Sequence, residues 1–218
     1  MTFEQGKVVP WIPNDTYKRS PDVAHASTSI PGVVLAGGQS RRMGTGKAFV
    51  DLAGKPLINH VIDRVRPQCA TLAINVNDDP HRFAVYNVPL LSDGSQRGRG
   101  PLAGILSAME WAATLGAEKV LVAPVDTPFL PTDLVMRLQR ANAAIALAQT
   151  ECRVHGTIGV WHVELRTQLR KALDSGMRKV TSWAMDQGAC TVRFENAHSF
   201  HNINSPTDLA YAEMLLRE

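Results

Sequence analysis

The sequence predicts a Rossmann-like, three-layer α/β/α fold with a mainly parallel sheet, on three observations. From Ile30 onward, short apolar runs of strand length alternate with stretches of helical periodicity, which is the pattern of βαβ units. The first apolar run leads directly into a glycine-rich loop, as in open sheets that bind ligands at their strand ends. With 218 residues, 44% of them hydrophobic, the chain can bury a core of that size.

The first half of the predicted domain contains four strands and two helices. Residues 57–65 place their apolar side chains at helical spacing, which predicts an amphipathic helix. Residues 102–115 predict a second helix, with Gly116 where a glycine commonly stops one. Pro89 indicates that the third strand is short or lies at an edge. The apolar runs predicted as strands are 32–36, 71–75, 88–91 and 119–123.

The second half continues the alternation. Pro131 is expected to begin a helix that runs to about Arg140. Ser205 and Pro206 have the residue types of an N-cap and a first helical position, so they predict the start of the last helix. The remaining predicted elements are strands at 144–148, 156–161 and 190–194 and helices at 163–174 and 178–186. We expect a single domain over 30–218, preceded by a flexible extension at 1–29.

Composition excludes several classes of function. The 23 Lys and Arg against 20 Asp and Glu leave a net charge of +3 without a dense basic run, which argues against a nucleic-acid partner. No uncharged apolar stretch approaches the roughly 18 residues that span a bilayer. The N-terminus has no signal-peptide pattern, so we expect a cytoplasmic protein without membrane association. Cys69, Cys152 and Cys190 fit neither a disulfide framework nor a zinc site.

The loop after the first predicted strand, Leu35-Ala-Gly-Gly-Gln-Ser-Arg-Arg-Met-Gly-Thr-Gly-Lys47, has the composition of a phosphate cradle. Gly37 and Gly38 let the backbone turn tightly and present its N–H groups to an anion, while Arg41, Arg42 and Lys47 add positive charge. The loop matches neither a P-loop nor a dinucleotide fingerprint. A flexible surface loop with solvated arginines is the weaker alternative, because the loop follows a strand end where open sheets bind ligands.

This loop resembles the signature of nucleotidyltransferases of the nucleotide-diphospho-sugar transferase type, and among them it is most similar to the molybdenum cofactor guanylyltransferases. The resemblance covers about residues 31–216, and it implies transfer of GMP from GTP to molybdopterin with Mg²⁺ as cofactor. Relatives commonly carry Asp where this chain has Gly46, although Lys47 is retained. The further blocks that match in order are 52–57 (LAGKPL), 100–105 (GPLAGI), 124–128 (PVDTP) and 202–206 (NINSP).

Asp126 is the carboxylate that the sequence points to most directly. It follows the apolar strand at 119–123 and stands between Pro124 and Pro128, so it can project into the ligand crevice at the strand end. Mg²⁺ in nucleotide sites is usually held by one or two carboxylates together with substrate phosphates. The resemblance implies that Asp126 is this ligand. The alternative is a helix-capping Asp, for which Thr132 and Asp133 are better placed.

Two further polar residues follow predicted strands. The resemblance places Asp93 in the nucleotide site, as a second candidate metal ligand, whereas an Asp-Gly turn residue is the alternative. It also implies that Asn75 contacts the nucleotide, together with the backbone of Leu35, Ala36, Gly37 and Gly38. A buried strand-end asparagine that satisfies backbone groups is the alternative for Asn75.

The second half of the chain is expected to bind the acceptor. By resemblance, the blocks around Asn202 and Asn204 line the molybdopterin side, and asparagine supplies the paired donors and acceptors that a pterin needs. Arg178 and Lys179 are candidates for the acceptor phosphate, and His155 is a further candidate on this side. The alternatives are that the asparagines cap the final helix and that the two cations are an ordinary exposed pair.

The resemblance favours guanine, because related cytidylyltransferases commonly read Leu-Ala-Ala-Gly where this chain has Leu-Ala-Gly37-Gly38. We expect the missing methyl group to let the larger purine approach the backbone. Catalysis would rest on Lys47, Arg42 and Asp126 and would need no protein nucleophile. The alternatives are a molybdopterin cytidylyltransferase, a sugar-phosphate nucleotidyltransferase, or a non-catalytic GTP-binding protein. Proteins that deliver molybdopterin and chaperones of molybdoenzymes are candidate partners.

Overall fold

The computed structural model describes residues 30–37, 46–151 and 153–217. The predicted extension 1–29 and most of the glycine-rich loop, residues 38–45, lie outside these ranges, as do residues 152 and 218. No helix within the described ranges is long and apolar enough to cross a membrane.

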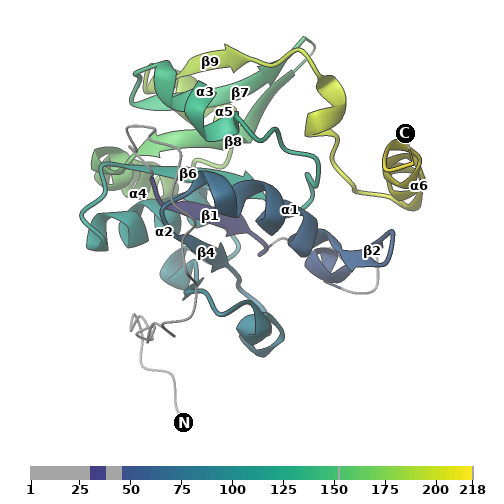
Figure 1. Cartoon of the computed structure of the whole chain (residues 1–218). Helices are drawn as coiled ribbons and strands as arrows, with labels where there is room; N and C mark the ends of the chain where they lie inside the picture. Colours follow the sequence, from purple (N-terminus) through teal and green to yellow (C-terminus); the bar gives the residue numbers. More distant parts are fainter. Residues whose placement is uncertain (1–29, 38–45, 152, 218) are drawn as a thin grey trace, which may run out of the picture.

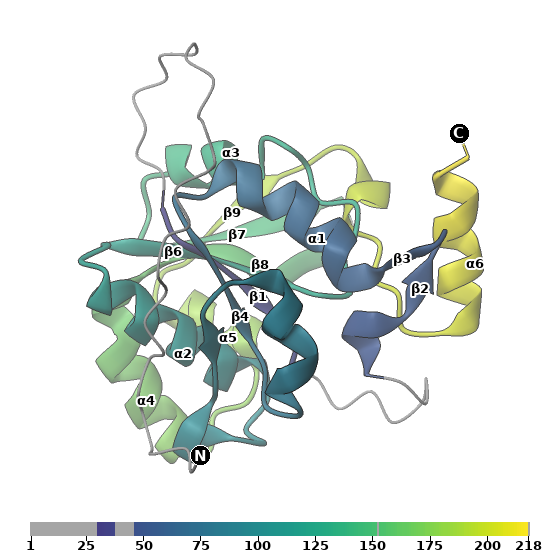
Figure 2. The ribbon, with the colours of Figure 1, turned by 60° about the horizontal axis from the view of Figure 1, so that its bottom comes forward.

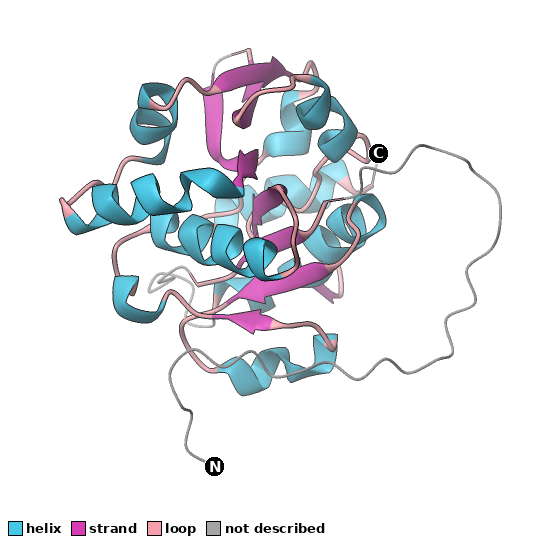
Figure 3. Cartoon of the chain, turned by 90° about the vertical axis from the view of Figure 1, so that its left-hand side faces the viewer, coloured by secondary structure: helices cyan, strands magenta, loops and turns pink. Residues whose placement is uncertain are grey.

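A seven-stranded sheet forms the centre of the molecule, in the order β5-β4-β1-β6-β8-β7-β9 (Figures 1 and 3). β8 runs antiparallel to its neighbours β6 and β7, whereas the other pairings of this sheet are parallel. The prediction of a mainly parallel sheet is therefore confirmed. The strands are β1 (Gly32–Leu35), β4 (Leu72–Asn75), β5 (Leu90–Leu91), β6 (Lys119–Pro124), β7 (Ile145–Thr150), β8 (Arg153–His162) and β9 (Cys190–Arg193).

Helices cover both faces of the sheet, with α1 and α3 on one side and α2, α4 and α5 on the other (Figure 2). Strand side chains alternate between the two layers: Val34 packs in the cluster that includes α1 and α3, and Val33 in the cluster that includes α2, α4 and α5. The helices are α1 (Leu57–Val65), α2 (Pro101–Thr114), α3 (Leu134–Arg140), α4 (Arg166–Asp174), α5 (Val180–Asp186) and α6 (Pro206–Leu215).

A short antiparallel hairpin, β2 (Asp51–Leu52) and β3 (Lys55–Pro56), stands apart from the main sheet and contacts α6 (Figures 1 and 2). A small apolar cluster joins them: Leu52 from the hairpin, Ile203 and Ala212 pack together in the interior. This contact holds the start of α6, and the residues before it, beside the carboxyl end of the central strands. The sequence does not predict the hairpin, because two-residue strands have no periodicity that a pattern can show.

Element boundaries differ from the predictions at a few places. The third strand covers only Leu90–Leu91, two residues after the predicted start, and a 3₁₀ helix, η3 (Pro80–Tyr86), precedes it. The α-helix predicted from Pro131 begins at Leu134 (α3), after a turn. α1 covers the predicted residues, and Ser205 is the N-cap of α6, where its side chain accepts a hydrogen bond from the Asp208 N–H at 3.2 Å.

Candidate nucleotide-binding site

The carboxyl ends of three adjacent strands, β4, β1 and β6, bring the predicted nucleotide residues to one edge of the sheet. The Ala36 N–H donates to the Asn75 carbonyl at 2.8 Å, and the Val125 N–H donates to the Leu35 carbonyl at 3.0 Å. These bonds extend the strand pairing past the strand ends. They place Leu35 and Ala36 between the two segments that carry Asn75 and Asp126, as the rule for open parallel sheets predicts.

Lys47 and Asp126, which are separated by 79 residues, form an ion pair at this edge, with the Lys47 Nζ 2.6 Å from the Asp126 Oδ2. Lys47 is the first residue of the 3₁₀ helix η1 (Lys47–Phe49), and Asp126 lies just beyond β6. The Lys47 Nζ also contacts the Asn204 Oδ1. The side chains of Lys47 and Asp126 are 15% and 17% exposed, so the pair is shielded but can be reached from solvent.

The segment before α6 runs beside Asp126. The Ile203 N–H donates to the Asp126 carbonyl at 2.9 Å, and the Thr127 hydroxyl donates to the Asn202 Oδ1 at 2.9 Å. The alternative interpretation, that Asn202 and Asn204 cap the last helix with their side chains, is wrong, because Ser205 occupies that position. The Asn202 side chain instead binds Thr127, and the Asn204 side chain binds Lys47.

Asp93 is held by two asparagines in a second cluster. The Asn75 Nδ2 donates to its Oδ1 at 2.8 Å, and the Asn77 Nδ2 donates to its Oδ2 at 2.7 Å. The Asn77 Oδ1 also accepts the Asp93 backbone N–H at 3.0 Å. Asn75 and Asp93 are buried, at 2% and 9% exposure, so these bonds satisfy polar groups that water hardly reaches.

Two glycines make room for these asparagines. A Cβ atom at Gly37 would lie 2.6 Å from the Asn77 Nδ2, and a Cβ atom at Gly104 in α2 would lie 2.9 Å from the Asn75 Oδ1. The expectation that the missing methyl group of Gly37 opens space for a purine is therefore wrong in its physical reason, because the Asn77 amide occupies that space. Gly104 belongs to the 100–105 block, and the structure explains its small size in the same way.

The rest of the predicted loop is only partly described. Gly38 and Arg42, predicted to bind the phosphates, lie outside the described residues. Gly46, where relatives commonly carry Asp, has a φ of −53°, which a residue with a side chain also adopts. A Cβ atom there would meet nothing closer than the Arg82 Nη1 at 3.6 Å. The departure at Gly46 is therefore compatible with the position of Lys47.

The predicted acceptor residues are less closely grouped. His155 is buried at 6% exposure, where its Nε2 lies 3.0 Å from the Thr150 hydroxyl and its ring stacks on Phe200 at 4.8 Å. Burial, and secondly the nearby charge of Arg153, lowers the pKa of His155 from 6.5 to about 4. Arg178 donates to the Met177 carbonyl at 2.8 Å, and Lys179 precedes α5 as its N-cap residue. His155 thus packs behind the segment that leads to Asn202.

The donor groups at this edge suit a magnesium ion that is completed by substrate. Within the described residues, no three His, Cys, Asp or Glu side chains are grouped so that they could hold a metal by themselves. Asp126 offers a partly exposed carboxylate beside Lys47, which fits an ion held by one carboxylate and by phosphates. Asp93 fits less well, because each of its oxygens already accepts an amide hydrogen.

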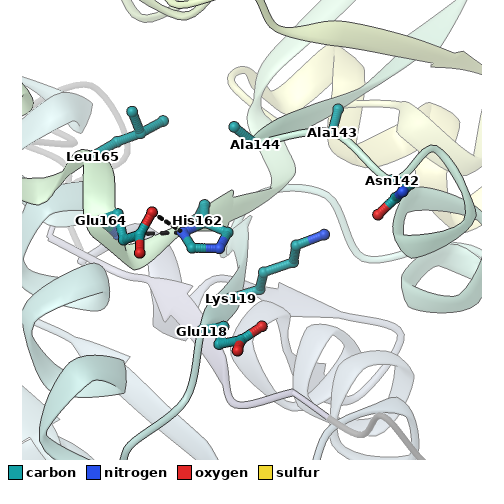
Figure 4. Close-up of a pocket in the computed structure, with 8 residues that line it drawn as sticks. All are labelled: Glu118, Lys119, Asn142, Ala143, Ala144, His162, Glu164 and Leu165. Atoms are coloured by element: carbon teal, nitrogen blue, oxygen red, sulfur yellow. Dashed lines mark hydrogen bonds and ion pairs between the residues drawn. The ribbon is translucent and has the colours of Figure 1, made fainter.

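A pocket of about 360 Å³ lies at the opposite end of the central strands, where β6 begins and the antiparallel β8 ends (Figure 4). Its polar lining includes Lys119, His162 and Glu164, and the His162 Nδ1 lies 3.7 Å from the Glu164 carboxylate. Open α/β sheets bind ligands at the carboxyl ends of their strands. The cluster around Lys47 and Asp126 is therefore the better candidate site.

Sequence reasoning misses the roles of Asn77 and Thr127. The sequence shows Asn77 only as part of a strand-end loop, and Thr127 only as part of a proline-flanked turn. Both bind other residues of the site, Asp93 and Asn202, which lie 16 and 75 positions away. The signal that could have found Asn77 is the Asn75-Val-Asn77 spacing, which puts two asparagines on the same face of an extended chain.

Comparison with known proteins identifies the family of the chain. Residues 32–189 match the model of the MobA-like NTP transferase domain family. The chain is 44% identical over 189 residues to a molybdenum cofactor guanylyltransferase of Cereibacter sphaeroides, covering 86% of this chain and 97% of the relative. It is 42% identical over 205 residues to that of Rhodopseudomonas palustris, covering 89% and 97%.

Solved structures show the same fold. The molybdopterin-guanine dinucleotide biosynthesis protein A of Archaeoglobus fulgidus superimposes with a TM-score of 0.69 at 24% identity, covering 86% of this chain and 99% of that one. The 2-C-methyl-D-erythritol 4-phosphate cytidylyltransferase of Thermus thermophilus gives a TM-score of 0.63 at 20% identity, covering 85% and 98%. At these identities the likeness concerns the architecture alone.

Proposed function

Because the chain belongs to the MobA-like NTP transferase family, we propose that it transfers GMP from GTP to molybdopterin and releases pyrophosphate. Membership makes the chain a nucleotidyltransferase of molybdenum cofactor biosynthesis. The observation that carries the proposal is the Lys47–Asp126 pair at the carboxyl edge of the sheet, because it places a cation and a metal-competent carboxylate side by side. The product is molybdopterin guanine dinucleotide.

The reaction is an in-line displacement at the α-phosphorus of GTP. An oxygen of the molybdopterin phosphate forms a new P–O bond, while the bond from the α-phosphorus to the bridging oxygen of the β-phosphate breaks and pyrophosphate leaves with that electron pair. This chemistry needs positioned phosphates and stabilised charge rather than a protein nucleophile. Leu35, Ala36 and Gly37 offer a backbone surface at the strand end, and Asn75 and Asp93 form its polar wall.

Lys47 and Asp126 have separate tasks once nucleotide enters. The Lys47 ammonium can turn from Asp126 and Asn204 toward the phosphates, because a flexible four-carbon stem carries it. Asp126 would then be free to hold Mg²⁺, which neutralises charge on the triphosphate when it is bound. Gly38 and Arg42, which lie outside the described residues, stay predicted phosphate contacts.

The acceptor is proposed to lie on the side of Asn202 and Asn204. Their segment is fixed against Asp126 by the Ile203 N–H and by Thr127, so a pterin that binds the asparagines has its phosphate directed toward the reacting edge. Arg178 and Lys179 are proposed to meet the phosphate of the acceptor. His155 contributes indirectly, because its ring supports Phe200 behind this segment.

The proposal is tested by incubating the full-length protein with Mg²⁺, molybdopterin and either GTP or CTP. We expect mass spectrometry to detect molybdopterin guanine dinucleotide, with one pyrophosphate released for each product formed. Reactions without molybdopterin, and reactions with EDTA, are the controls. Faster turnover with CTP would contradict the guanine assignment, and binding of GTP without pyrophosphate release would indicate a non-catalytic nucleotide-binding protein.

A further inference from the structure

Asn77 is bound to Asp93 at both ends of its amide, a contact that the proposed reaction does not by itself require. Its Nδ2 donates to the Asp93 Oδ2 at 2.7 Å, and its Oδ1 accepts the Asp93 N–H at 3.0 Å. Rotation of the amide away from this position breaks both hydrogen bonds. Asn77 therefore fixes the direction in which the Asp93 carboxylate points.

Gly37 is the residue against which this amide packs. A Cβ atom at position 37 would lie 2.6 Å from the Asn77 Nδ2, and no real pair of such atoms is that close. Gly37 is not among the glycines with positive φ, so its backbone conformation accepts a side chain. The reason for glycine here is the space that Asn77 needs.

We propose that Asn77 is a positioning residue of the nucleotide site, and that a side chain at position 37 would act on nucleotide binding through Asn77 and Asp93. A methyl group at position 37 displaces the Asn77 amide, and Asp93 then loses one of the two asparagines that orient it. This inference rests on the proposed function in one respect, because it takes the Asp93 cluster to be part of the GTP site.

Asn75 gives the arrangement a second, independent support. Its Nδ2 donates to the other oxygen of Asp93 at 2.8 Å, and a Cβ atom at Gly104 would lie 2.9 Å both from its Oδ1 and from the Leu35 Cδ2. Each asparagine that holds Asp93 thus has a glycine beside it. Because the two glycines come from different elements, the loop after β1 and α2, the pattern is not a local consequence of one turn.

A double-mutant cycle separates the two ways in which residue 37 can act. The variants are Gly37→Ala, Asn77→Ala and the combination, each assayed for the KM of GTP and of molybdopterin and for kcat. Asn77→Ala removes the amide, so the methyl group introduced at position 37 keeps only the Asn75 Oδ1 as a close neighbour, at an ordinary contact distance of 3.4 Å. We expect each single change to raise the KM for GTP about tenfold, and the double variant to be no worse than the more impaired single variant.

Positioning predicts a selective effect. The KM for molybdopterin should stay within about twofold in all three variants, because the side chains of Asn202 and Asn204 bind Thr127 and Lys47, whereas Asn77 binds Asp93. Multiplied losses in the double variant would mean that the methyl group at position 37 acts independently of Asn77, and would overturn the proposal. Equal rises in both KM values would indicate general damage to the fold and would overturn it too.

The melting temperature of the nucleotide-free protein provides a readout that does not depend on activity. Gly37→Ala should lower the melting temperature when Asn77 is present. When Asn77 has been replaced by alanine, adding Gly37→Ala should leave the melting temperature unchanged. Asn77→Ser replaces Asn77→Ala in the cycle where the alanine variant fails to fold. If the wild-type protein makes no dinucleotide, the proposed function fails, yet this melting cycle still decides whether Gly37 and Asn77 are coupled.

Discussion

Two aspartates stand at the candidate site, and the protein holds them in opposite ways. Asp126 is paired with one flexible cation, the Lys47 ammonium at 2.6 Å, and its side chain is 17% exposed. Within the described residues, Asp93 forms no ion pair. It is buried and receives one amide hydrogen on each oxygen, from Asn75 and Asn77.

The difference shows what each carboxylate is suited to do. A lysine can swing away and leave Asp126 open to a new partner, such as a metal ion, at little structural cost. The Asn75 amide is buried and would be left without an acceptor if it moved away from Asp93, so Asp93 is a fixed acceptor in the wall of the site. We therefore expect activity to depend most on Asp126 and stability to depend most on Asp93.

Replacing Asp126 by alanine should have the largest effect on catalysis. Loss of a group that holds charge in place at the reacting phosphates commonly costs about 10²–10³ in kcat, and we expect a loss at the upper end. The free energy of unfolding should change by less than about 1 kcal/mol, because the partly exposed ion pair contributes little. Initial rates of pyrophosphate release and urea unfolding measure the two quantities. Unchanged activity would refute a metal or phosphate role for Asp126.

Replacing Asp93 by alanine should reverse this balance. The change leaves the amides of Asn75 and Asn77 without their acceptor. An unsatisfied buried donor costs about 1–3 kcal/mol, which applies to the buried Asn75, whereas the half-buried Asn77 can turn to water, so we expect a destabilisation of about 1–3 kcal/mol. Urea unfolding measured beside Asp126→Ala is the matched comparison, since both variants remove one carboxylate. Equal stability of the two variants would mean that the asparagine cluster does not stiffen the site.

The pH dependence of stability reports on His155, whose ring stacks on Phe200 in the segment that leads to Asn202. His155 has a pKa of about 4 in the folded protein against 6.5 unperturbed, so folding favours its neutral form. The contribution of His155 to the free energy of unfolding is fully present above about pH 6.5. It is lost progressively as the pH falls to about 4, by up to about 3 kcal/mol. His155→Gln should flatten urea-unfolding stability across this interval, whereas His81→Gln, at an exposed position, should not. Equal pH curves for wild type and His155→Gln would contradict the assignment.

Much of the fold could be predicted because its elements carry local patterns. The apolar spacing of 57–65 predicts α1, and Ser205 with Pro206 predicts the start of α6. The hairpin β2–β3 and the two-residue extent of β5 could not be found, since two residues show no periodicity. The predicted start of α3 lies three residues early, because Pro131 suits a first helical position but here precedes a turn.

The site, like the fold, has features that the sequence could predict and features that it could not. The strand-end rule predicts that Lys47, Asn75, Asp93 and Asp126 meet, because each follows a recognisable element. It could not predict their partners, since Lys47 reaches Asn204 across 157 positions and Asn77 reaches Asp93 across 16. Such contacts depend on how elements pack, and the space beside Gly37 is a clear case: the sequence suggests that it serves the substrate, but it serves Asn77.

The smallest predicted effect concerns the bond that joins the Asp126 segment to the acceptor side. Thr127 is fully buried, and its hydroxyl donates to the Asn202 Oδ1 at 2.9 Å, with the Asp126 Oδ1 as a more distant acceptor at 3.3 Å. Thr127→Val keeps the shape but removes this donor, which should cost about 1 kcal/mol in urea unfolding. The segment stays attached, because the Ile203 N–H still donates to the Asp126 carbonyl at 2.9 Å.

Asn202 is then free to turn, so Thr127→Val should raise the KM for molybdopterin severalfold while the KM for GTP stays close to that of the wild type. Thr114→Val is the matched control, because it removes a hydroxyl that donates to the Trp111 carbonyl within α2 at 2.7 Å, in a helix that lies apart from Asn202. A rise in the KM for GTP instead would assign Thr127 to the nucleotide side. The boundary between the two halves of the site would then lie between Thr127 and Asn202, rather than between Asp126 and Thr127.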